Sequence, residues 1–387
     1  MTIAGYGADK VVITGNNTSR IFSTTVSAVV SIKGVTLTGG NGAGAASTGF
    51  GGAILAANDL TLDGVQVTGN NVPQNGGGVY FFGGSSHRIH NSTFSSNSAN
   101  GCGAFENDSV LTIANTTISD NTAWGQGGGL CNFGNLTIRN ATIAGNTAAT
   151  GGGIFQSVNF LNLGNTLIAA NTAASNNPPD IHYNSGSLLT AGSNLIGVNT
   201  SVGAQFPVGN PNGFGDWVGD QITPLNPMLS ALGSNGGTTR TRSLLSGSPA
   251  IDKGDNAKAV DPFDGSPLST DQRGFQRIVG GLSQPPLVDI GAYEFVPAFA
   301  PTAAEVSVSG RVSTSAGYGI SRARVILTDA NGMVRTSLTN AFGFFSLRGI
   351  RAGSVGIIEI SSKRYTFRPR LVAIDDALTG LDFVADK

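Results

Sequence analysis

The fold is decided by one stretch of sequence, Gly127-Gly128-Gly129-Leu130 followed by Leu136-Thr137-Ile138, Thr142-Ile143 and Asn146-Thr147-Ala148. The same order of elements starts again at Gly101 and at Gly151, so residues 101–173 hold three copies. Partial copies extend the pattern in both directions, and each ends on an asparagine. These asparagines lie at positions 41, 70, 97, 121, 146, 171 and 199. A repeat with a period of about 20–50 residues indicates a solenoid before any other architecture.

The contents of each copy identify the kind of solenoid. Short segments of alternating residues, rich in Ile, Leu, Val and Thr, are separated by Gly or Asn. No copy contains the longer run of helix-forming residues that a leucine-rich or ankyrin repeat requires. The sequence therefore predicts an all-β fold, a right-handed parallel β-helix of seven to eight coils of about 25 residues, followed by a small antiparallel β-sandwich.

The repeat register assigns residues to the inside or the outside of a coil, because side chains alternate along a strand. One inward file consists of Ile54, Val79, Ala104, Leu130 and Ile154, so the next residue of each copy points outward. Three aromatic residues in this outward file are candidates for contact with glycans or another partner, since aromatic rings stack on flat apolar faces. They are Tyr80, Phe105 and Phe155. Packing beneath a loop is the alternative explanation.

The recurrent asparagines have a structural explanation. A coil turns sharply, and asparagine tolerates the left-handed conformation that such a corner requires. Stacked amide side chains also hydrogen-bond from coil to coil. We therefore expect a structural ladder made of Asn70, Asn97, Asn121, Asn146, Asn171 and Asn199.

The composition fits an all-β protein solvated by uncharged polar residues. Charged residues make up 12% of the chain, the hydrophobic share is 40%, and glycine occurs 57 times. There is no run of about 18 apolar residues, so we expect no transmembrane segment. No signal peptide is visible after Met1. Because a strand-like pattern already runs at Val11, we expect that Met1 lies inside a longer natural chain or a trimmed one.

Charge is distributed unevenly along the chain. The net charge is −1, but residues 306–387 hold 11 Lys and Arg against 6 Asp and Glu, which gives +5. A basic unit is attracted to anionic envelope polymers, although an ordinary solvated surface explains the same charge. No basic stripe with interleaved aromatic residues occurs, so nucleic acid is not an expected partner.

Cys102 and Cys131 are the two cysteines of the chain. If both segments are extended, the repeat register places their side chains on opposite faces of the wall. Their Cα atoms would then lie roughly 10 Å apart, beyond the separation of about 7 Å that a disulfide can span. We therefore predict two free thiols.

The repeats resemble those of bacterial surface β-helix proteins, including polymorphic outer-membrane-protein-like repeats. Five motifs follow the repeats in order, and together they resemble the module that closes choice-of-anchor Q proteins. They are Asn226-Pro227-Met228-Leu229, Leu232-Gly233-Ser234-Asn235-Gly236-Gly237, Ser246-Gly247-Ser248-Pro249-Ala250-Ile251-Asp252, Thr270-Asp271-Gln272-Arg273-Gly274 and Asp289-Ile290-Gly291-Ala292-Tyr293-Glu294. The resemblance implies a secreted or cell-surface bacterial protein whose means of attachment differs between members.

A second resemblance concerns the C-terminal region. Val308-Ser309-Gly310-Arg311, Asn340-Ala341-Phe342-Gly343-Phe344-Phe345 and Ser361-Ser362-Lys363-Arg364-Tyr365-Thr366-Phe367 are similar to carboxypeptidase-regulatory-like domains. The resemblance implies an accessory or spacer module without peptidase activity. We expect β-helix repeats over 1–200, the choice-of-anchor Q-like end and cap over 201–297, a linker over 298–305 and the sandwich over 306–387. The cap is expected to close the end of the rod, where strand edges are otherwise unpaired.

Right-handed β-helices can carry enzymes that act on polysaccharides, which need clustered carboxylates or a basic residue above a groove. In the repeat register the acidic residues scatter, and only Glu106 and Asp108 lie close together. His87 and His90 are interpreted as part of an exposed polar wall. We assign no catalytic residue.

Calcium is the one cofactor for which the sequence offers candidates. Asp252, Asp255 and Asp271 occur in a loop-rich stretch, and oxygen-rich loops suit Ca²⁺. No EF-hand spacing occurs, and ion pairs or backbone hydrogen bonds explain these acids equally well.

These observations favour a non-catalytic, secreted or cell-surface protein with a structural or adhesin-like function, whose walls contact extracellular glycans, envelope components or proteins. The alternative is a carbohydrate-active enzyme (a polysaccharide lyase or hydrolase) or a glycan-binding protein on the same scaffold. A third hypothesis is a self-assembling filament subunit that associates through its N-terminal coil.

Overall fold

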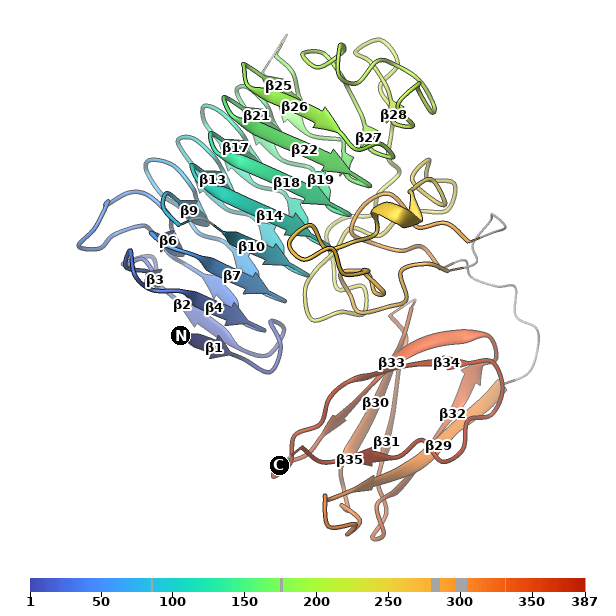
Figure 1. Ribbon diagram of the computed structural model, residues 1–387. Coiled ribbons are helices and arrows are strands. Elements are labelled where there is room, and N and C mark those ends of the chain that lie inside the picture. The colour runs from blue at the N-terminus through green and yellow to red at the C-terminus, as the bar shows by residue number, and fades with distance from the viewer. Residues whose placement is uncertain (85, 175–176, 280–285, 297–304, 331, 387) are drawn as a thin grey trace. The chain divides into compact units, whose positions relative to one another are not determined.

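The computed structural model of the protein describes residues 1–84, 86–174, 177–279, 286–296, 305–330 and 332–386 (Figure 1). The chain forms two compact units. The first consists of Met1–Gly233 and Gly237–Phe295, and the second of Ser234–Gly236 and Val296–Lys387. The linker predicted over 298–305 falls almost entirely outside the described residues. Within those residues, no helix has the length and apolarity needed to cross a membrane.

The first unit is a solenoid of parallel strands in four sheets, which we call sheets A to D. Sheet A has the order β1 (Thr2–Ala4), β4 (Val30–Lys33), β7 (Leu60–Asp63), β10 (His87–His90), β14 (Val110–Ala114), β18 (Asn135–Arg139), β22 (Phe160–Gly164) and β26 (Ser187–Thr190). Sheet B has the order β2 (Val12–Thr14), β5 (Thr36–Thr38), β8 (Gln66–Thr68), β11 (Thr93–Ser95), β15 (Thr117–Ser119), β19 (Thr142–Ala144), β23 (Leu167–Ile168), β27 (Leu195–Ile196) and β28 (Trp217–Val218).

The other two sheets complete each turn of the solenoid. Sheet C has the order β25 (Ile181–Tyr183), β21 (Ile154–Gln156), β17 (Leu130–Asn132), β13 (Phe105–Asn107), β9 (Val79–Phe81), β6 (Ile54–Ala56) and β3 (Phe22–Ser23). Sheet D is shorter, with β12 (Ser98–Ala99), β16 (Thr122–Ala123), β20 (Thr147–Ala148) and β24 (Thr172–Ala173). The predicted fold class is confirmed, although the longest sheet has nine strands rather than the seven to eight coils expected.

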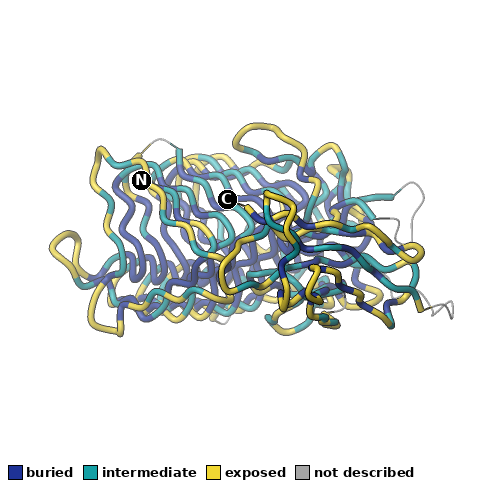
Figure 2. The backbone as a smooth tube through the Cα atoms, turned by 90° about the horizontal axis from the view of Figure 1, so that it is seen from below, coloured by how far each residue is buried: buried dark blue, intermediate teal, exposed yellow. Residues whose placement is uncertain are grey.

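The strands stack in register because equivalent residues of the repeat face one another. Leu136 of β18 pairs with Leu111 on one side and Leu161 on the other, and Ile138 pairs with Ile113. The inward residues are fully buried in one continuous apolar core, whereas the residues between them are partly exposed. Figure 2 shows these buried stretches running side by side from coil to coil. Burial of the aliphatic files at about 25 cal/mol per Å² of apolar surface is the main stabilising contribution.

Residues 237–279 and 286–295 lie along the outer face of sheet B. The outward threonines of three successive strands are covered by this segment: Thr93 donates to the carbonyl of Arg240 at 2.5 Å, Thr117 donates to Gln272 at 2.6 Å, and Thr142 accepts from the N–H of Ala292 at 3.0 Å. Of the predicted cap over 201–297, the first part lies at the end of sheet B, where β28 pairs with β27 and Val202, Phe206 and Val218 join the core. The described residues from Gly237 to Phe295 cover the side of the rod. Among its described residues, this segment contains the helical turn η1 (Asn256–Lys258). Apolar side chains of the segment and of sheet B form a second, smaller core between them.

The second unit is a small β-sandwich. One sheet has the order β32 (Phe344–Arg351), β29 (Glu305–Ser313) and β35 (Phe383–Val384), and the other has β31 (Val334–Leu338), β30 (Arg324–Asp329), β33 (Ser354–Ser361) and β34 (Arg370–Ile374). Apart from the parallel pair β29 and β35, the strand pairs are antiparallel. Both sheets contribute side chains to one apolar core, which includes Val308, Val325, Phe345 and Ile358.

Candidate functional site

In sheet C, the register of β13 alone among the strands of the predicted inward file differs from the sequence-based assignment, by one residue. Val79 of β9 pairs with Phe105 of β13, so Phe105 occupies the inward position that we had assigned to Ala104. The Phe105 ring packs against Phe81 and Phe94, with centroid separations of 5.9 and 5.3 Å. The prediction that Phe105 points outward is therefore wrong. Burying a phenylalanine ring removes more apolar surface from water than burying a methyl group, which favours this register.

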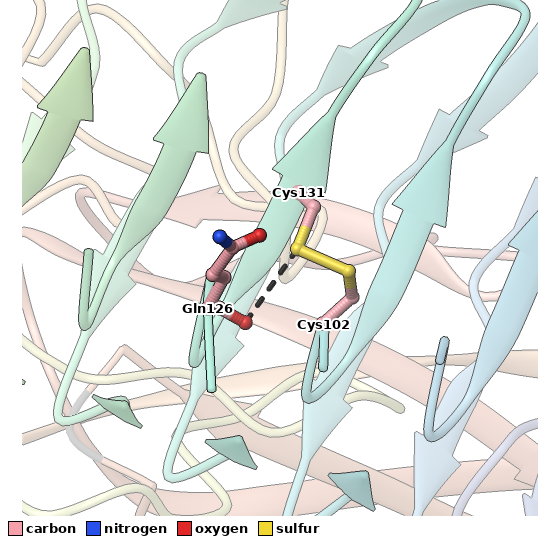
Figure 3. The surroundings of a disulfide bond; sticks show 3 residues. All are labelled: Cys102, Gln126 and Cys131. Atoms are coloured by element: carbon pink, nitrogen blue, oxygen red, sulfur yellow. Dashed lines mark hydrogen bonds between the residues drawn. A yellow bond between two sulfur atoms is a disulfide. The ribbon is translucent and has the colours of Figure 1, made fainter. Parts of the chain in front are cut away.

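The prediction of two free thiols is also wrong. Cys102 and Cys131 form a disulfide, with Cα atoms 5.2 Å apart (Figure 3). We had assumed an extended backbone at Cys102, whereas this residue turns the corner of its coil in the left-handed region, at φ 60°. The corner and the shifted register together bring its sulfur to Cys131 on the next coil. The disulfide therefore links two successive coils covalently.

Tyr80 lies at the centre of an aromatic group on the outer face of sheet C. Its ring stacks between those of Phe50 and Phe82, with centroid separations of 5.3 and 5.5 Å and interplanar angles of 27° and 28°. Phe82 is 39% exposed, and the other two rings are half-buried. We call these three residues the aromatic platform. Its flat apolar surface is of the kind that stacks on sugar rings.

Phe155 also belongs to the outer face of sheet C, but it is not available for contact. Its ring stacks on that of His182, with centroids 5.0 Å apart and planes at 5°. It packs with the two bonded cysteines in a small apolar cluster and is buried. Of the three aromatic residues predicted as contacts, only Tyr80 lies in an outward platform.

Two carboxyl groups lie beside the platform. The hydroxyl of Tyr80 donates a hydrogen bond of 2.6 Å to Oδ2 of Asp108. Glu106, on the neighbouring strand β13, lies close enough to Asp108 and Asn75 for both to act on its pKa. Burial and then the charge of Asp108 raise the pKa of Glu106 to about 7. Oε2 of Glu106 is buried and has no hydrogen-bond partner among the residues that the structure describes.

This arrangement has a chemical consequence. Glu106 holds its proton close to neutral pH, so the pair offers a proton donor next to a second carboxyl group. Burial and Asp108 also raise the pKa of the Tyr80 hydroxyl, so this hydroxyl stays protonated and keeps donating to Asp108. The aromatic platform and the carboxyl pair together form the candidate site.

Five of the predicted ladder asparagines form one buried column at the corner between sheets B and D. The amides of Asn70, Asn97, Asn121 and Asn146 each donate to Oδ1 of the next asparagine at 2.9–3.0 Å. The same oxygens accept the backbone N–H groups of these residues at 3.0–3.2 Å. Every amide is thereby tied to the next coil.

The column ends on a carboxylate and not on Asn199. Asn171 donates to Oδ1 of Asp180 at 2.9 Å, and Oδ2 of Asp180 accepts the N–H of Val198 at 2.7 Å. Asn199 instead donates to the carbonyl of Phe206 at 2.8 Å. Its assignment to the ladder is wrong, because the loop after β24 returns Asp180 to the position of the next acceptor. Burial raises the pKa of Asp180 to about 7.

The calcium candidates do not converge. Both oxygens of Asp271 are occupied by Arg273 and by backbone N–H groups. Asp255 caps η1 and pairs with Lys258 at 2.9 Å. Asp252 is buried, and its N–H donates to Asp289. Among the described residues, no group of three or more His, Cys, Asp and Glu side chains is placed to hold a metal ion.

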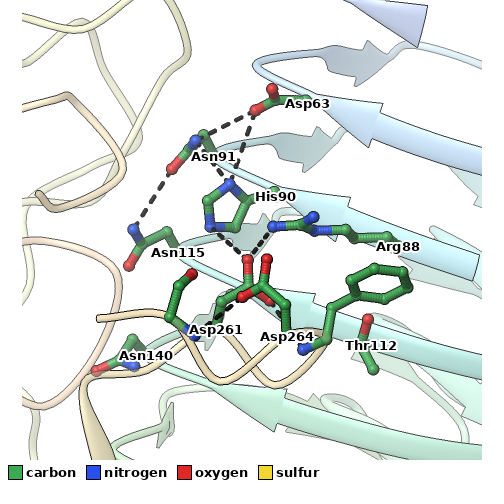
Figure 4. A network of polar contacts seen from close by, with 12 residues as sticks. Asp63, Arg88, His90, Asn91, Thr112, Asn115, Asn140, Asp261 and Asp264 are labelled. Atoms are coloured by element: carbon green, nitrogen blue, oxygen red, sulfur yellow. Dashed lines mark hydrogen bonds and ion pairs between the residues drawn. The ribbon is translucent and has the colours of Figure 1, made fainter. Parts of the chain in front are cut away.

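The two histidines predicted on an exposed wall have different environments. His87 is fully buried, where its Nδ1 accepts the N–H of Leu60 at 3.1 Å and burial lowers its pKa. His90 belongs to a polar network under the cap, shown in Figure 4. Its Nε2 lies 3.6 Å from Asp261, which also pairs with Arg88, and its Nδ1 lies 3.8 Å from Asp63. The expectation that both histidines are exposed is wrong.

A second file of asparagines holds the cap on the solenoid. Asn91, Asn115, Asn140 and Asn165 all have φ between 47° and 50°, the left-handed corner conformation. The amides of Asn115, Asn140 and Asn165 donate to carbonyls of the cap at 2.8, 3.3 and 2.9 Å. This edge of the solenoid is therefore used for cap attachment.

Two members of the platform, Phe50 and Phe82, were not among the contact residues predicted from the sequence. Tyr80 and Phe82 alternate along one strand end, and this period of two places both rings on one face. Phe50 lies in the loop between coils, where no periodic pattern identifies it. Its contact with Tyr80 is evident from the three-dimensional structure alone.

Comparison with protein-family models gives one match. A model described as a right handed beta helix region matches residues 11–210, which is just over half of the chain. No curated protein matches the chain.

Proposed function

The chain belongs to the right-handed β-helix family, and on this premise we propose that it is a non-catalytic, secreted or cell-surface protein of structural or adhesin-like function. In this proposal the solenoid is a rigid support, and its outer wall contacts glycans. The rigidity is supported by the asparagine column, which ties each coil to the next through buried amides, and by the disulfide between two coils.

The observation that carries the glycan contact is the aromatic platform. Phe50, Tyr80 and Phe82 present stacked rings on a wall made of regular strands. The hydrogen bond from Tyr80 to Asp108 holds the central ring in place, so little conformational freedom is lost on binding. Asp108 and Glu106 also offer polar atoms next to the rings, which suit the hydroxyl groups of a neutral sugar.

Binding of neutral oligosaccharides tests this proposal. Cellohexaose and xylohexaose are titrated into the full chain by calorimetry, and Phe82→Ala is expected to weaken binding at least about tenfold, since stacking on an aromatic ring contributes on the order of 1 kcal/mol or more. Trp124→Ala is the matched control, because Trp124 is also an exposed aromatic residue of the solenoid, at 79%. Equal loss in both variants, or no binding of either sugar, contradicts the proposal.

The second candidate function is a carbohydrate-active enzyme, and the carboxyl pair is the observation in its favour. General acid catalysis needs a carboxyl group that keeps its proton near neutral pH, and the raised pKa of Glu106 meets this need. Asp108 would then serve as the base or nucleophile. The test is release of reducing or unsaturated sugar ends from neutral and acidic polysaccharides between pH 5 and 8. Release that Glu106→Gln and Asp108→Asn abolish supports the enzyme, and no release at any pH excludes it for those substrates.

We also propose the location and the finer family assignments. A disulfide persists in oxidising compartments, which supports secretion or surface display. The interlocked motifs around Asp271 and Asp289 support a choice-of-anchor Q-like module, and the sandwich supports a carboxypeptidase-regulatory-like domain. Protease treatment of intact producing cells tests the location: loss of the protein indicates display, and protection contradicts it.

The third candidate is a self-associating subunit. Strands β1, β2 and β3 stand at the edges of their sheets, and Ile3, Ile13 and Phe22 are only partly buried there. An unpaired edge is a template for pairing with another chain. Analytical ultracentrifugation over a wide concentration range tests this candidate, and a monomer at all concentrations excludes it.

A further inference from the structure

The second unit contains a pocket at one end of its four-stranded sheet. The pocket has a volume of about 440 Å³ and is lined by the loop that follows β29 and the loop that follows β33. These two loops meet because the first residue of β30, Arg324, pairs with the last residue of β33, Ser361. The volume lies within the range of about 300–1,000 Å³ that small-molecule sites occupy.

The walls of the pocket are held by hydrogen bonds. In the first loop, Thr314 donates its N–H to the carbonyl of Tyr318 at 2.8 Å. Arg322 donates its N–H to the carbonyl of Thr339 at 3.0 Å. The hydroxyl of Thr339, which is buried, donates to the carbonyl of Ile320 at 2.7 Å. The loop is therefore built into the sandwich, so a ligand need not order it.

Arg322 has an unusual backbone conformation. Its φ is 57°, in the left-handed region that a residue with a side chain rarely adopts. The hydrogen bond to Thr339 holds the backbone there, and the exposed Arg322 is one of the residues that line the pocket. Strain of this kind is found at ligand-binding positions more often than elsewhere.

The lining combines two aromatic rings with three cations. Tyr318 and Tyr365 are 74% and 39% exposed. Arg322, Lys363 and Arg364 are also exposed. Within the described residues, no ion pair joins any of these cations to a carboxylate. Residues 306–387 carry a net charge of +5, so the field around the pocket favours anions.

We propose that this pocket binds an acidic polysaccharide built from uronic acids. Each uronic acid residue has a flat apolar face and one carboxylate. Tyr318 and Tyr365 stack on the sugar faces, and the guanidinium groups of Arg322 and Arg364 bind carboxylates with paired N–H donors. Lys363 adds a point charge. The site is separate from the aromatic platform and does not depend on the function proposed for the solenoid.

Nucleic acid also combines charge with stacking, but it fits this surface less well. Proteins that bind single strands need a basic groove that follows the backbone over several nucleotides. Here the cations are gathered around one pocket at the end of a sheet. An oligonucleotide is therefore one arm of the test.

The test measures binding of polygalacturonic acid to the full chain by affinity electrophoresis and calorimetry at 150 mM salt. Tyr318→Ala and Arg364→Ala are each expected to weaken binding at least about tenfold. The matched controls are Phe342→Ala, an aromatic residue 70% exposed on the same unit, and Arg348→Ala, an exposed arginine. Each control is expected to change the affinity less than about twofold.

Three further probes decide the chemistry. Fully methyl-esterified polygalacturonate and dextran are expected to bind weakly, because neither carries carboxylates. Oligodeoxythymidylate of equal charge is expected to bind at least about tenfold more weakly than polygalacturonate. Equal binding of the esterified polymer, tighter binding of the oligonucleotide, or equal losses in pocket and control variants overturns the proposal. Loss of Glu106 or Phe82 leaves this binding unchanged, so failure here and failure of the solenoid's function are distinguishable.

Discussion

The asparagine column and the cap bury polar groups in two different ways. In the column, the buried groups are neutral amides, and each amide finds its partner one coil further on. In the cap, the buried groups are ionisable, namely Asp252, Asp271, Arg273, Arg277, Asp289 and Glu294. A repeat offers every amide the same neighbour, so one uncharged residue type satisfies the hydrogen bonds of the column. The cap occurs once, and its groups are satisfied one by one: Asp271 pairs with Arg273, and Asp289 and Glu294 accept backbone N–H groups, whereas Nε and Nη1 of Arg277 have no hydrogen-bond partner among the described residues.

The cap network has Asp271 at its centre. Its carboxylate accepts from the guanidinium of Arg273 at 2.7 and 2.9 Å and from the N–H of Glu294 at 3.0 Å. Arg273 also lies over the ring of Tyr293, 3.6 Å from its centroid. Burial lowers the pKa of Arg277 and raises that of Glu294 well above its usual value. The stability of the cap therefore depends on protonation, whereas that of the column depends on geometry.

Asp271→Ala is expected to have the largest effect. It leaves the buried guanidinium of Arg273 without its carboxylate and several buried N–H groups without their acceptor, and breaking a buried pair on one side costs about 3–5 kcal/mol. The measurement is chemical denaturation of the full chain. Asp264→Ala is the control, because Asp264 is exposed. Asp271→Leu combined with Arg273→Met is expected to lose less than Asp271→Ala alone, and a larger loss contradicts the assignment of the cost to an unpaired charge.

Asn121→Ala is expected to have the next largest effect, a loss of about 3 kcal/mol in the free energy of unfolding. The change removes the oxygen that accepts two hydrogen bonds from Asn97, and each buried unsatisfied donor costs about 1–3 kcal/mol. Asn100→Ala is the control, because Asn100 is exposed. Denaturation of both variants measures the difference. A loss below about 0.5 kcal/mol for Asn121→Ala shows that the column is not a stabilising element.

Removal of the disulfide measures how much a covalent link between coils stabilises the protein, for comparison with the hydrogen-bonded asparagine column. Cys102 and Cys131 are 29 positions apart, and closing a loop of that size stabilises by about 3.6 kcal/mol in the chain-entropy account. The double variant Cys102→Ala and Cys131→Ala is expected to lose about 2–3 kcal/mol. A reductant is expected to destabilise the unaltered protein and to leave the double variant unchanged. Equal sensitivity to the reductant in both contradicts the bond.

The difference between the two regions also explains what the sequence predicted. Leu136, Ile138 and Asn121 recur at a fixed spacing, so the coil, its inside and most of its column followed from periodicity. Phe105 was assigned to the wrong face because the glycine-rich segment before it can be aligned with its neighbours in two registers that are one residue apart. The two registers differ in which side chain, Ala104 or Phe105, pairs with Val79 in the core. Asn199 was misplaced because the loop after β24 breaks the period.

The cap and the candidate site depend on contacts that no period encodes. Gln272 meets Thr117 across 155 positions, so its place along sheet B was not predictable from local pattern. The carboxyl pair was found as two neighbouring acids, but its raised pKa depends on burial by surrounding coils. Residues that occur once need three-dimensional partners before their chemistry can be predicted.

The last prediction distinguishes the cap from the asparagine column by the pH dependence of their contributions to stability. Burial raises the pKa of Asp289 to about 7, so the folded state keeps a proton that the unfolded chain releases near pH 4. Between these values the folded state binds more protons, and its stability falls as the pH rises. Asp180 and Glu106 act in the same direction, whereas the neutral amides of the column add nothing. Between pH 5 and 7 we expect a loss of at least about 2 kcal/mol, since one pKa unit corresponds to about 1.4 kcal/mol.

The variant Glu294→Gln assigns this loss to the cap. Glu294 accepts the N–H of Asp289 at 3.0 Å, and a glutamine keeps an acceptor there while removing a titratable group whose pKa burial and Asp289 raise well above its usual value. Denaturation at pH 5 and 7 is expected to show a smaller difference for Glu294→Gln than for the unaltered protein. Asp9→Asn, a change at an exposed carboxylate, is expected to leave the difference unchanged. If Glu294→Gln leaves it unchanged too, the pH dependence arises in the solenoid, from Asp180 or Glu106, and the cap is not the proton-sensitive part of the molecule.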